Sequence, residues 1–261
     1  MAATTRKREP LIWKSCLFER NDDDPFSHLK IQSAHYLDDI SERGVCPECY
    51  KSRMYFCYSC FKAVDTVNDR VPQLRLPLHI DIIKHAGEVD GKSTAAHLAI
   101  LAPQDVSVYT YPNIPDYRGK NVLLLFPGEN AQSLEQHWQQ AQAVVTARRG
   151  LCHMCKGLHQ GLPWHNLILI DSTWRQTKRI YLDERMEGLP CAVLEGGQSA
   201  FWRPQRGKPS SWLATVEAAH LALSRLLELQ GCEAHVDDLL FFFKYFYKKI
   251  RTKYKDFGLL E

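Results

Sequence analysis

Short apolar runs alternate with longer amphipathic segments over most of the chain. The apolar runs have the length of strands and lie at 78–83, 106–111, 122–126, 167–170 and 191–194. The segments with helical periodicity lie at 93–101, 133–149, 173–185 and 212–230, with a last one from about 236. Runs this short and this apolar are typical of strands that are covered on both faces. The alternation therefore predicts an α/β fold, in which a mostly parallel sheet carries helices on both faces.

The chain is long enough, at 261 residues, to form one large domain with a small appendage. We expect an irregular N-terminal segment over 1–40, a cysteine-rich element over 41–70 and an α/β domain over 71–261. No apolar run approaches the roughly 18 residues of a membrane helix, and the N-terminus lacks the apolar core of a secretory signal. The sequence thus predicts an intracellular protein with no membrane contact, in the nucleus or the cytoplasm.

Two C-x-x-C pairs follow one another in the run CPECYKSRMYFCYSC. Their thiols belong to Cys46, Cys49, Cys57 and Cys60. Each pair makes a turn that directs two thiolates at one point, and two such knuckles complete a tetrahedral zinc site. We predict a structural zinc, because four sulfur ligands leave no position open for water. The alternative is a group of four free thiols.

A third cysteine pair, Cys152 and Cys155, lies close to His153, His159 and His165. A second metal site is one interpretation of this mixture of thiols and imidazoles. We favour the other interpretation, a long insertion with incidental thiols, because the stretch is rich in glycine.

A loosened phosphate-binding motif, A-x-x-x-x-G-K-S, occupies residues 86–93 between a predicted strand and a predicted helix. Together with Asp171, which ends the strand LILID and would hold magnesium, it would indicate a nucleotide hydrolase. Two carboxylates oppose that interpretation, because Glu88 and Asp90 would sit inside a nest that must receive phosphate. The same letters also fit a plain turn whose hydroxyl residues cap the next helix.

The run LILIDSTWRQTK contains Asp171, Ser172, Thr173 and Trp174 and resembles the D-x-T-W signature of the DTW-domain family. The stretches DIIKHAGEVDGKSTAAH, LLLFPGENA, FWRPQRGKP and LATVEAAHLAL, and the first two cysteine pairs, resemble the family's other blocks in order and spacing. The likeness covers roughly 40–257 and is closest to eukaryotic members. The chain departs from the family pattern where Ala86 replaces a proline and where Ala214 begins a Ser-Thr-x-Glu motif.

The resemblance implies a function in tRNA modification. The family is understood to comprise S-adenosylmethionine-dependent tRNA-uridine aminocarboxypropyltransferases that are related in fold to knotted SPOUT methyltransferases. It therefore implies transfer of a 3-amino-3-carboxypropyl group to N3 of a tRNA uridine, in the D-loop, with release of 5'-methylthioadenosine. A C-terminal knot is implied as well. We expect tRNA as partner and a monomeric chain, with a dimer left open.

Three rival functions stay open on the residues alone. They are an RNA methyltransferase of SPOUT type, a nucleotide hydrolase with the phosphate-binding loop, and a zinc-bearing RNA-binding module without activity. The overall charge does not choose among them, because the net charge is only +3.

The predicted catalytic residues are Asp171, Thr173 and Trp174. Asp171 ends a strand at the edge where sites of α/β sheets gather, and we predict that it takes the proton from uridine N3. The alternative role of Asp171 is that of a helix N-cap. Trp174 could stack on a base, although such an aromatic residue is more often part of a core. The predicted residues for S-adenosylmethionine are Leu125, Phe126, Pro127, Gly128, Glu129, Thr215 and Glu217.

Basic residues near this predicted site are expected to contact RNA phosphates, which would make the affinity depend on salt. They are Arg175, Lys178, Arg179, Arg203, Arg206 and Lys208. The C-terminal segment FFFKYFYKKIRTKYKDF adds further cations that are interleaved with aromatic residues. RNA contact and a solvated helix face are equally good interpretations of that segment.

Overall fold

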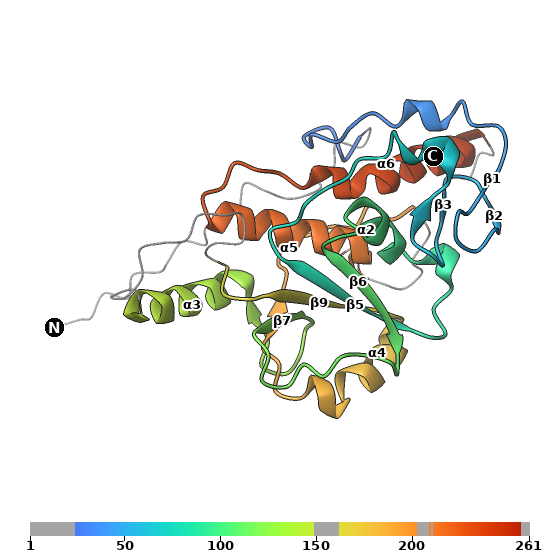
Figure 1. The fold of residues 1–261 in the computed structure, drawn as a ribbon. Coiled ribbons are helices and arrows are strands. Elements are labelled where there is room, and N and C mark those ends of the chain that lie inside the picture. Colours follow the sequence, from blue (N-terminus) through green and yellow to red (C-terminus); the bar gives the residue numbers. More distant parts are fainter. Residues whose placement is uncertain (1–23, 149–161, 203–208, 210, 257–261) are drawn as a thin grey trace.

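The centre of the computed structural model, which describes residues 24–148, 162–202, 209 and 211–256, is a six-stranded sheet (Figure 1). The strands are β5 His79–His85, β6 Val106–Tyr111, β7 Val122–Leu125, β8 Gln132–Ser133, β9 Asn166–Asp171 and β10 Cys191–Val193. All neighbours run parallel, in the order β6-β5-β9-β7-β10-β8. The predicted α/β class and parallel sheet are therefore confirmed, and β8 adds a strand that the sequence pattern does not predict.

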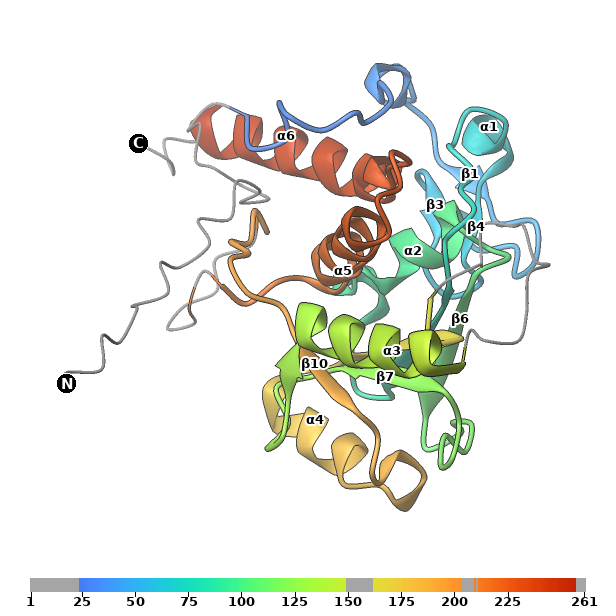
Figure 2. The same cartoon turned by 90° about the vertical axis from the view of Figure 1, so that its left-hand side faces the viewer.

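Helices cover both faces of the sheet (Figures 1 and 2). One face carries α2 Ala95–Leu101, α3 Leu134–Arg148 and α5 Thr215–Leu229, with α6 Phe241–Asp256 outside α5. The other face carries α4 Trp174–Tyr181, which contacts β5 and β9, and the 3-10 helix η3 Glu184–Met186. Shorter helices are η1 His35–Leu37, α1 Asp65–Asn68, η2 Asp90–Lys92 and η4 Asp237–Leu240.

The central strands are apolar because both of their faces are buried. In β9, Leu167 and Leu169 belong to the larger hydrophobic core beneath α2 and α5, whereas Ile168 belongs to the smaller core on the side of α4. Successive side chains of a strand point to opposite faces, so a strand between two helical layers has no polar side.

The N-terminal segment 24–40 has little regular structure but is packed onto the domain. Phe26 is fully buried, with its ring 5.2 Å from that of Tyr247 and 6.1 Å from that of Phe243. The carboxylate of Asp237 accepts a hydrogen bond of 2.8 Å from the Lys30 N–H. The described part of this segment therefore covers α6.

The cysteine-rich element consists of two antiparallel hairpins. β1 Gly44–Val45 pairs with β2 Ser52–Arg53, and β3 Phe56–Cys57 pairs with β4 Lys62–Ala63. Phe56 joins the element to the domain, since its ring lies 4.7 Å from the ring of Phe242 in α6 and 5.6 Å from that of His97 in α2.

The order of the strands creates a crevice at one edge of the sheet. β5 and β9 are neighbours, yet β5 leads to α2 on one face and β9 leads to α4 on the other. Such a switch point leaves space outside the carboxyl ends of the two strands, which is where α/β sheets bind ligands.

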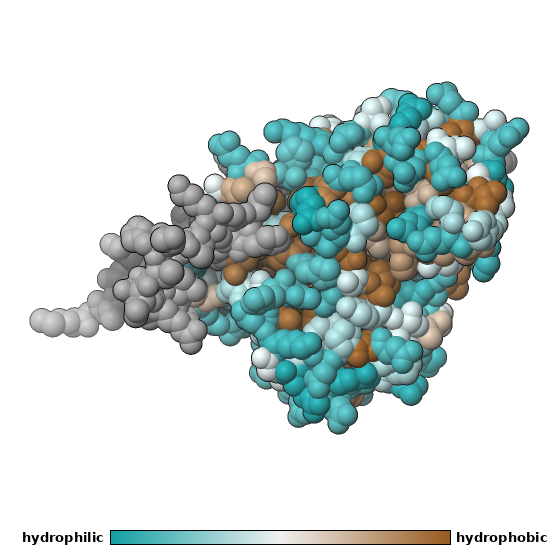
Figure 3. Space-filling model, in the orientation of Figure 1, coloured by the Kyte–Doolittle hydropathy of each residue, from teal (hydrophilic) through white to brown (hydrophobic). Residues whose placement is uncertain are grey.

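The described surface is mainly polar on the face seen in Figure 3, where apolar side chains show between the polar ones. Large hydrophobic side chains that are more than half exposed are Val45, Tyr50, Val89 and Leu182. In the described ranges no helix has both the length and the apolar character that a membrane crossing requires.

Candidate functional site

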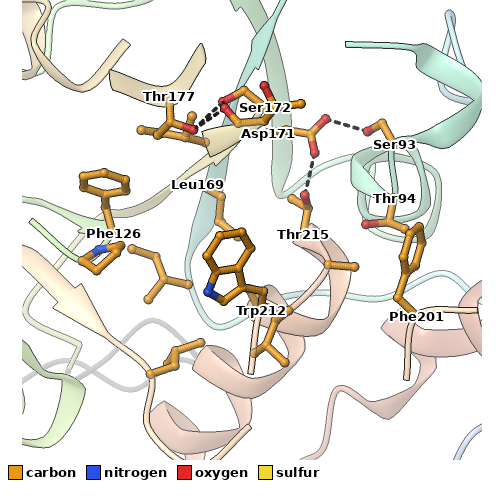
Figure 4. Close-up of a pocket in the computed structure, with 18 of the residues that line it drawn as sticks. Ser93, Thr94, Phe126, Leu169, Asp171, Ser172, Thr177, Phe201, Trp212 and Thr215 are labelled. Atoms are coloured by element: carbon orange, nitrogen blue, oxygen red, sulfur yellow. Dashed lines mark hydrogen bonds between the residues drawn. The ribbon is translucent and has the colours of Figure 1, made fainter. Parts of the chain in front are cut away.

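A pocket of about 670 Å³ opens at this edge of the sheet (Figure 4). Its walls come from the loop after β5, from the ends of β7, β9 and β10, and from the segment that enters α5. The apolar part of its lining includes Leu125, Phe126, Leu169, Phe201, Trp212 and Leu213. The polar part includes Glu88, Lys92, Ser93, Asp171, Thr173 and Thr215. This mixed lining suits a ligand with one flat, weakly polar part and one charged part.

Asp171 lines the pocket and is only 7% exposed. Its Oδ2 accepts a hydrogen bond of 2.6 Å from the Ser93 hydroxyl, and its Oδ1 accepts one of 2.6 Å from the Thr215 hydroxyl (Figure 4). Ser93 Oγ in turn accepts a bond from the Ala95 N–H, so its own proton is directed at Asp171. One carboxylate thus joins the loop after β5, the end of β9 and the first residue of α5.

Asp171 is not a helix cap, so that alternative interpretation is wrong. α4 begins at Trp174, and its N-cap is Thr173. The Thr173 N–H and hydroxyl donate to Gln176 Oε1 at 3.1 and 2.8 Å. Thr173 lines the pocket, whereas the Trp174 side chain lies outside the described residues.

The GKST loop is built differently from a phosphate-binding loop. The described glycines with positive φ are Gly119, Gly188, Gly196 and Gly231, so the loop lacks the left-handed residues that form an anion nest. Its hydroxyls have other partners: Ser93 donates to Asp171, and Thr94 Oγ1 accepts from the Val216 N–H at 3.2 Å. The loop, which connects β5 to α2, is therefore held by hydrogen bonds to the end of β9 and to α5 beside the pocket.

Glu88 is a second carboxylate in the lining of the pocket. Burial, followed by the charge of Asp171, raises its pKa, against the opposing charges of Lys84, Lys92 and His85. Two carboxylates in different surroundings therefore line the same pocket.

Four of the seven residues predicted for S-adenosylmethionine line the pocket, namely Leu125, Phe126, Pro127 and Thr215. Gly128 and Glu129 follow directly but are not part of its lining. Glu217 is not part of it either, and its side chain is buried beneath the entry to α5.

Glu217 holds the two chain segments that flank the pocket. Its Oε1 accepts a 2.7 Å bond from the Ala200 N–H, and its Oε2 accepts 2.7 Å bonds from the Ser199 hydroxyl and the Ala214 N–H. Burial raises the pKa of Glu217 to about 7, although these three donors oppose that shift. The lining residues Phe201 and Trp212 lie within two residues of these contacts, so Glu217 positions the wall of the pocket.

Gly128 is required by close packing. A Cβ at this position would lie 2.7 Å from Tyr181 Oη and 3.0 Å from Cys191 Sγ. We expect Gly128→Ala to lower the free energy of unfolding by about 1–3 kcal/mol, as overpacked cores do. Chemical denaturation should show that Gly128→Ala costs much less in a Tyr181→Phe background, which removes the nearest atom. An equal cost in both backgrounds would contradict this contact.

The predicted RNA-binding residues divide into two groups. Arg175, Lys178 and Arg179 are exposed on α4, which begins at the pocket. Arg203, Arg206 and Lys208 lie outside the described residues.

Most aromatic residues of the C-terminal helix belong to the core or pack against it. Tyr245 and Tyr247 are buried, and the Tyr245 hydroxyl donates to Asp38 at 2.9 Å. Lys248 pairs with Asp24 at 3.0 Å. The helix therefore offers cations to solvent but does not expose these two rings for stacking on bases.

The four cysteines of the first two pairs lie together, with all Sγ atoms within 4.8 Å of one another. A tetrahedral ion with Zn–S bonds of about 2.3 Å has sulfurs about 3.8 Å apart, and Cys49 Sγ and Cys57 Sγ are 3.6 Å apart. Tyr50 and Phe61, which follow the two pairs, share a left-handed backbone with φ of 57° and 55°. The cluster could therefore hold a metal ion.

The surroundings of Cys57 favour its thiolate form. Burial opposes its thiolate, but the N–H groups of Cys60 and Ser59 and the Arg53 side chain outweigh it and lower the pKa of Cys57 to about 6. The pKa of Cys60 is raised in turn, because its thiol is hydrogen-bonded to Cys49 and Cys57. A metal needs thiolate ligands, so Cys57 is the thiol of the cluster that is most ready to bind one. Cys152 and Cys155 lie outside the described residues.

Several residues of the pocket are absent from the sequence-based prediction. The most important are Lys92, Ser93, Phe201 and Trp212. A signal for Lys92 and Ser93 was available, because loops that follow neighbouring parallel strands meet at one edge. Using it requires knowing that β5 lies beside β9.

Comparison of the sequence with known proteins identifies a family and several similar proteins. The sequence model of the DTW domain matches residues 54–251. Proteins named tRNA-uridine aminocarboxypropyltransferase 1 are similar to the chain: the one from Xenopus tropicalis is 37% identical over 89% of this chain and 88% of its own length. Those from Rattus norvegicus and Homo sapiens are each 36% identical over 88% of this chain, and 84% and 85% of their own lengths. No solved structure gives a significant match.

Proposed function

Because the chain belongs to the DTW-domain family, we propose that it is a tRNA-uridine aminocarboxypropyltransferase. The observation that carries this proposal is the position of Asp171. This residue begins the D-x-T-W signature and lies in the pocket at the switch point of the sheet, held by Ser93 and Thr215.

The proposed donor is S-adenosylmethionine. Uridine N3 attacks the sulfonium-bound carbon of the aminocarboxypropyl arm, the N–C bond forms, and the C–S bond breaks. The bonding electrons go to sulfur, which leaves as neutral 5'-methylthioadenosine, and the N3 proton goes to a base. Geometry selects this product, since a methyltransferase would present the methyl carbon of the same sulfonium.

The size and the lining of the pocket support this donor. A volume of about 670 Å³ falls within the usual range for small-molecule sites. The aromatic side chains of Phe126 and Trp212 suit an adenine ring. The charged side chains of Asp171 and Lys92 suit the ammonium and carboxylate of the amino-acid arm.

We assign different tasks to the remaining predicted residues. Asp171 is the central acid, which fixes Ser93 and Thr215 and presents a negative charge to the cationic donor. Thr173 and Trp174 stay in the proposed site as the start of α4. Gly128 and Glu129 shape the turn after β7, and Glu217 acts through the walls that it holds.

The proposed substrate is a uridine of tRNA, and the D-loop is the proposed place. Arg175, Lys178 and Arg179 are exposed on α4, which reaches the pocket through Thr173 and Thr177, and they suit contact with phosphates. We assign the same role to Arg203, Arg206 and Lys208, whose segment runs between the lining residues Phe201 and Trp212. The affinity of the protein for tRNA should then fall as the salt concentration rises.

Four further proposals complete this description. The cysteine cluster holds a structural zinc, which all four thiolates would bind without leaving a position for water. A SPOUT-like C-terminal knot rests on the family resemblance. The chain acts as a monomer, and it acts inside the cell, in the nucleus or the cytoplasm, where unmodified tRNA is found.

One experiment tests the function directly. The protein is incubated with unmodified tRNA and S-adenosylmethionine that carries a label in its carboxyl group. We expect label in the RNA and 5'-methylthioadenosine as the small product, measured by mass spectrometry. Unlabelled RNA with S-adenosylhomocysteine would identify a methyltransferase instead, and the absence of any product with either ligand bound would identify a binding module.

A further inference from the structure

The pocket holds two carboxylates, and we propose that Glu88, not Asp171, accepts the proton that leaves uridine N3. This assignment rests on the proposed function and names a catalytic residue for it. The distinction matters because N3 is a weakly acidic imide nitrogen, and its attack on carbon requires loss of that proton.

Asp171 is poorly placed to act as the base. Both of its oxygens already accept hydrogen bonds of 2.6 Å, from Ser93 and Thr215, and 7% of its surface is exposed. A proton on either oxygen would displace the hydroxyl that donates to it and break a contact that holds two elements together. These features suit a residue that fixes the geometry of the site.

Glu88 has the opposite surroundings. It lines the same pocket from the loop between β5 and α2 and is half-buried. Its backbone is fixed by a 2.9 Å bond from its N–H to the His85 carbonyl. Among the described residues, none donates a hydrogen bond to its carboxylate, so both oxygens can face a substrate.

The charges around Glu88 tune it for proton transfer. Asp171 faces it from β9, Lys84 and His85 from β5, and Lys92 from η2. Burial and then the Asp171 charge raise the pKa of Glu88, which makes its carboxylate a stronger base than an exposed one. A stronger base nearer neutral pH accelerates proton transfer.

The step balances with the groups present. A Glu88 oxygen binds the N3 proton as the nitrogen forms its bond to the carbon of the donor's arm. The carbon–sulfur bond breaks, and its electron pair neutralises the sulfonium. Glu88 leaves the step protonated and returns its proton to solvent when the products depart.

The test compares Glu88→Gln with wild type and with Glu187→Gln, which changes an exposed carboxylate directly after η3. We expect Glu88→Gln to lower kcat about 10²–10⁴-fold, the usual contribution of general acid–base catalysis. Binding of S-adenosylmethionine, measured by calorimetry, and the melting temperature should stay close to wild type. Glu187→Gln should retain full activity. Glu88→Asp, which keeps a carboxylate, should recover part of the lost rate.

Two readouts separate a base from a structural residue. The wild-type rate should rise with pH as Glu88 ionises, and Glu88→Gln should lose this rise and recover at higher pH, where the imide ionises unaided. In addition, tRNA transcribed with 5-fluorouridine has a more acidic N3, so it should restore Glu88→Gln far more than it accelerates wild type.

The possible failures are distinguishable. A Glu88→Gln variant that transfers the group at the wild-type rate would overturn the assignment, and so would a slow variant that 5-fluorouridine does not rescue. Wild-type protein that leaves the tRNA unlabelled would overturn the proposed function and this assignment with it.

Discussion

Replacing Asp171 by asparagine is expected to lower aminocarboxypropyl transfer about 10²-fold or more, because misplacement of reacting groups by about 1 Å has an effect of this size. The carboxylate accepts two hydroxyl bonds of 2.6 Å. An asparagine can accept only one of them, and its NH₂ group would face the other hydroxyl as a second donor. Ser93 or Thr215 must then turn away, and the loop or the helix that carries it must shift.

The measurement is the rate of label transfer to tRNA, together with the affinity for S-adenosylmethionine. Asp69→Asn, at an exposed aspartate after α1, is the matched control and should leave both unchanged. Thr215→Val and Ser93→Ala each remove one donor and should cost less, about tenfold each, or about 1.4 kcal/mol. Because the three residues act as a unit, combining Asp171→Asn with Thr215→Val should cost less than the sum. Full activity in Asp171→Asn would contradict the central role of this acid.

Replacing Cys46 by serine is expected to remove the bound metal and to destabilise the fold. Structural zinc contributes about 10–16 kcal/mol to small zinc-finger peptides, and part of this should appear here because the hairpins share contacts with the domain. The Tyr55 and Tyr245 hydroxyls are 2.8 Å apart, and Phe56 packs on Phe242. A loss of about 2 kcal/mol would lower the melting temperature by roughly 4–8 °C.

Elemental analysis should find one zinc per wild-type chain and none in Cys46→Ser. Cys232→Ser is the matched control, because Cys232 is exposed and lies outside the cluster. A strong chelator should lower the melting temperature of wild type and Cys232→Ser but not that of Cys46→Ser. A metal-free wild-type protein of the same stability would show that the cluster is only a group of thiols.

The positions of the strands could be predicted closely, because each buried strand appears in the sequence as one short apolar run. The run LILI predicts a strand at 167–170, and β9 spans Asn166–Asp171. The ends of the helices are predicted less exactly. The pattern predicts a helix over 173–185, but α4 ends at Tyr181 and η3 follows from Glu184, because Asp183 accepts a bond from the Arg185 N–H and starts a new turn.

The start of α5 shows why helix ends need tertiary contacts. The pattern places its beginning at Trp212, whereas α5 begins at Thr215. Glu217 accepts a bond from the Ala214 N–H and makes Ala214 the N-cap, although alanine cannot cap with its own side chain. The start of α5 is therefore marked by Glu217, three residues after the N-cap. The sequence alone does not reveal this, because Glu217 is fixed by its other partners, Ser199 and Ala200.

The site could be predicted in part, for a similar reason. Asp171 and Thr173 follow one predicted strand and Phe126 ends another, so the gathering of strand ends brings them to the pocket. Glu88 and Ser93 also follow a strand, but they look like a phosphate-binding loop until the order of the strands is known. In α6 the sequence suggests a surface that the structure does not offer. Tyr245 and Tyr247 alternate with cations as in an RNA-binding segment, but both are buried in the core.

The bond between Asp171 and Thr215 has a consequence for biosynthesis. The chain leaves the ribosome from its N-terminus, so the DSTW run is exposed to solvent well before the first turn of α5 has been made. Nascent chains that stop short of this helix lack one of the two hydroxyls that hold the acid. They should be unable to modify RNA, even when every strand of the sheet has already been translated.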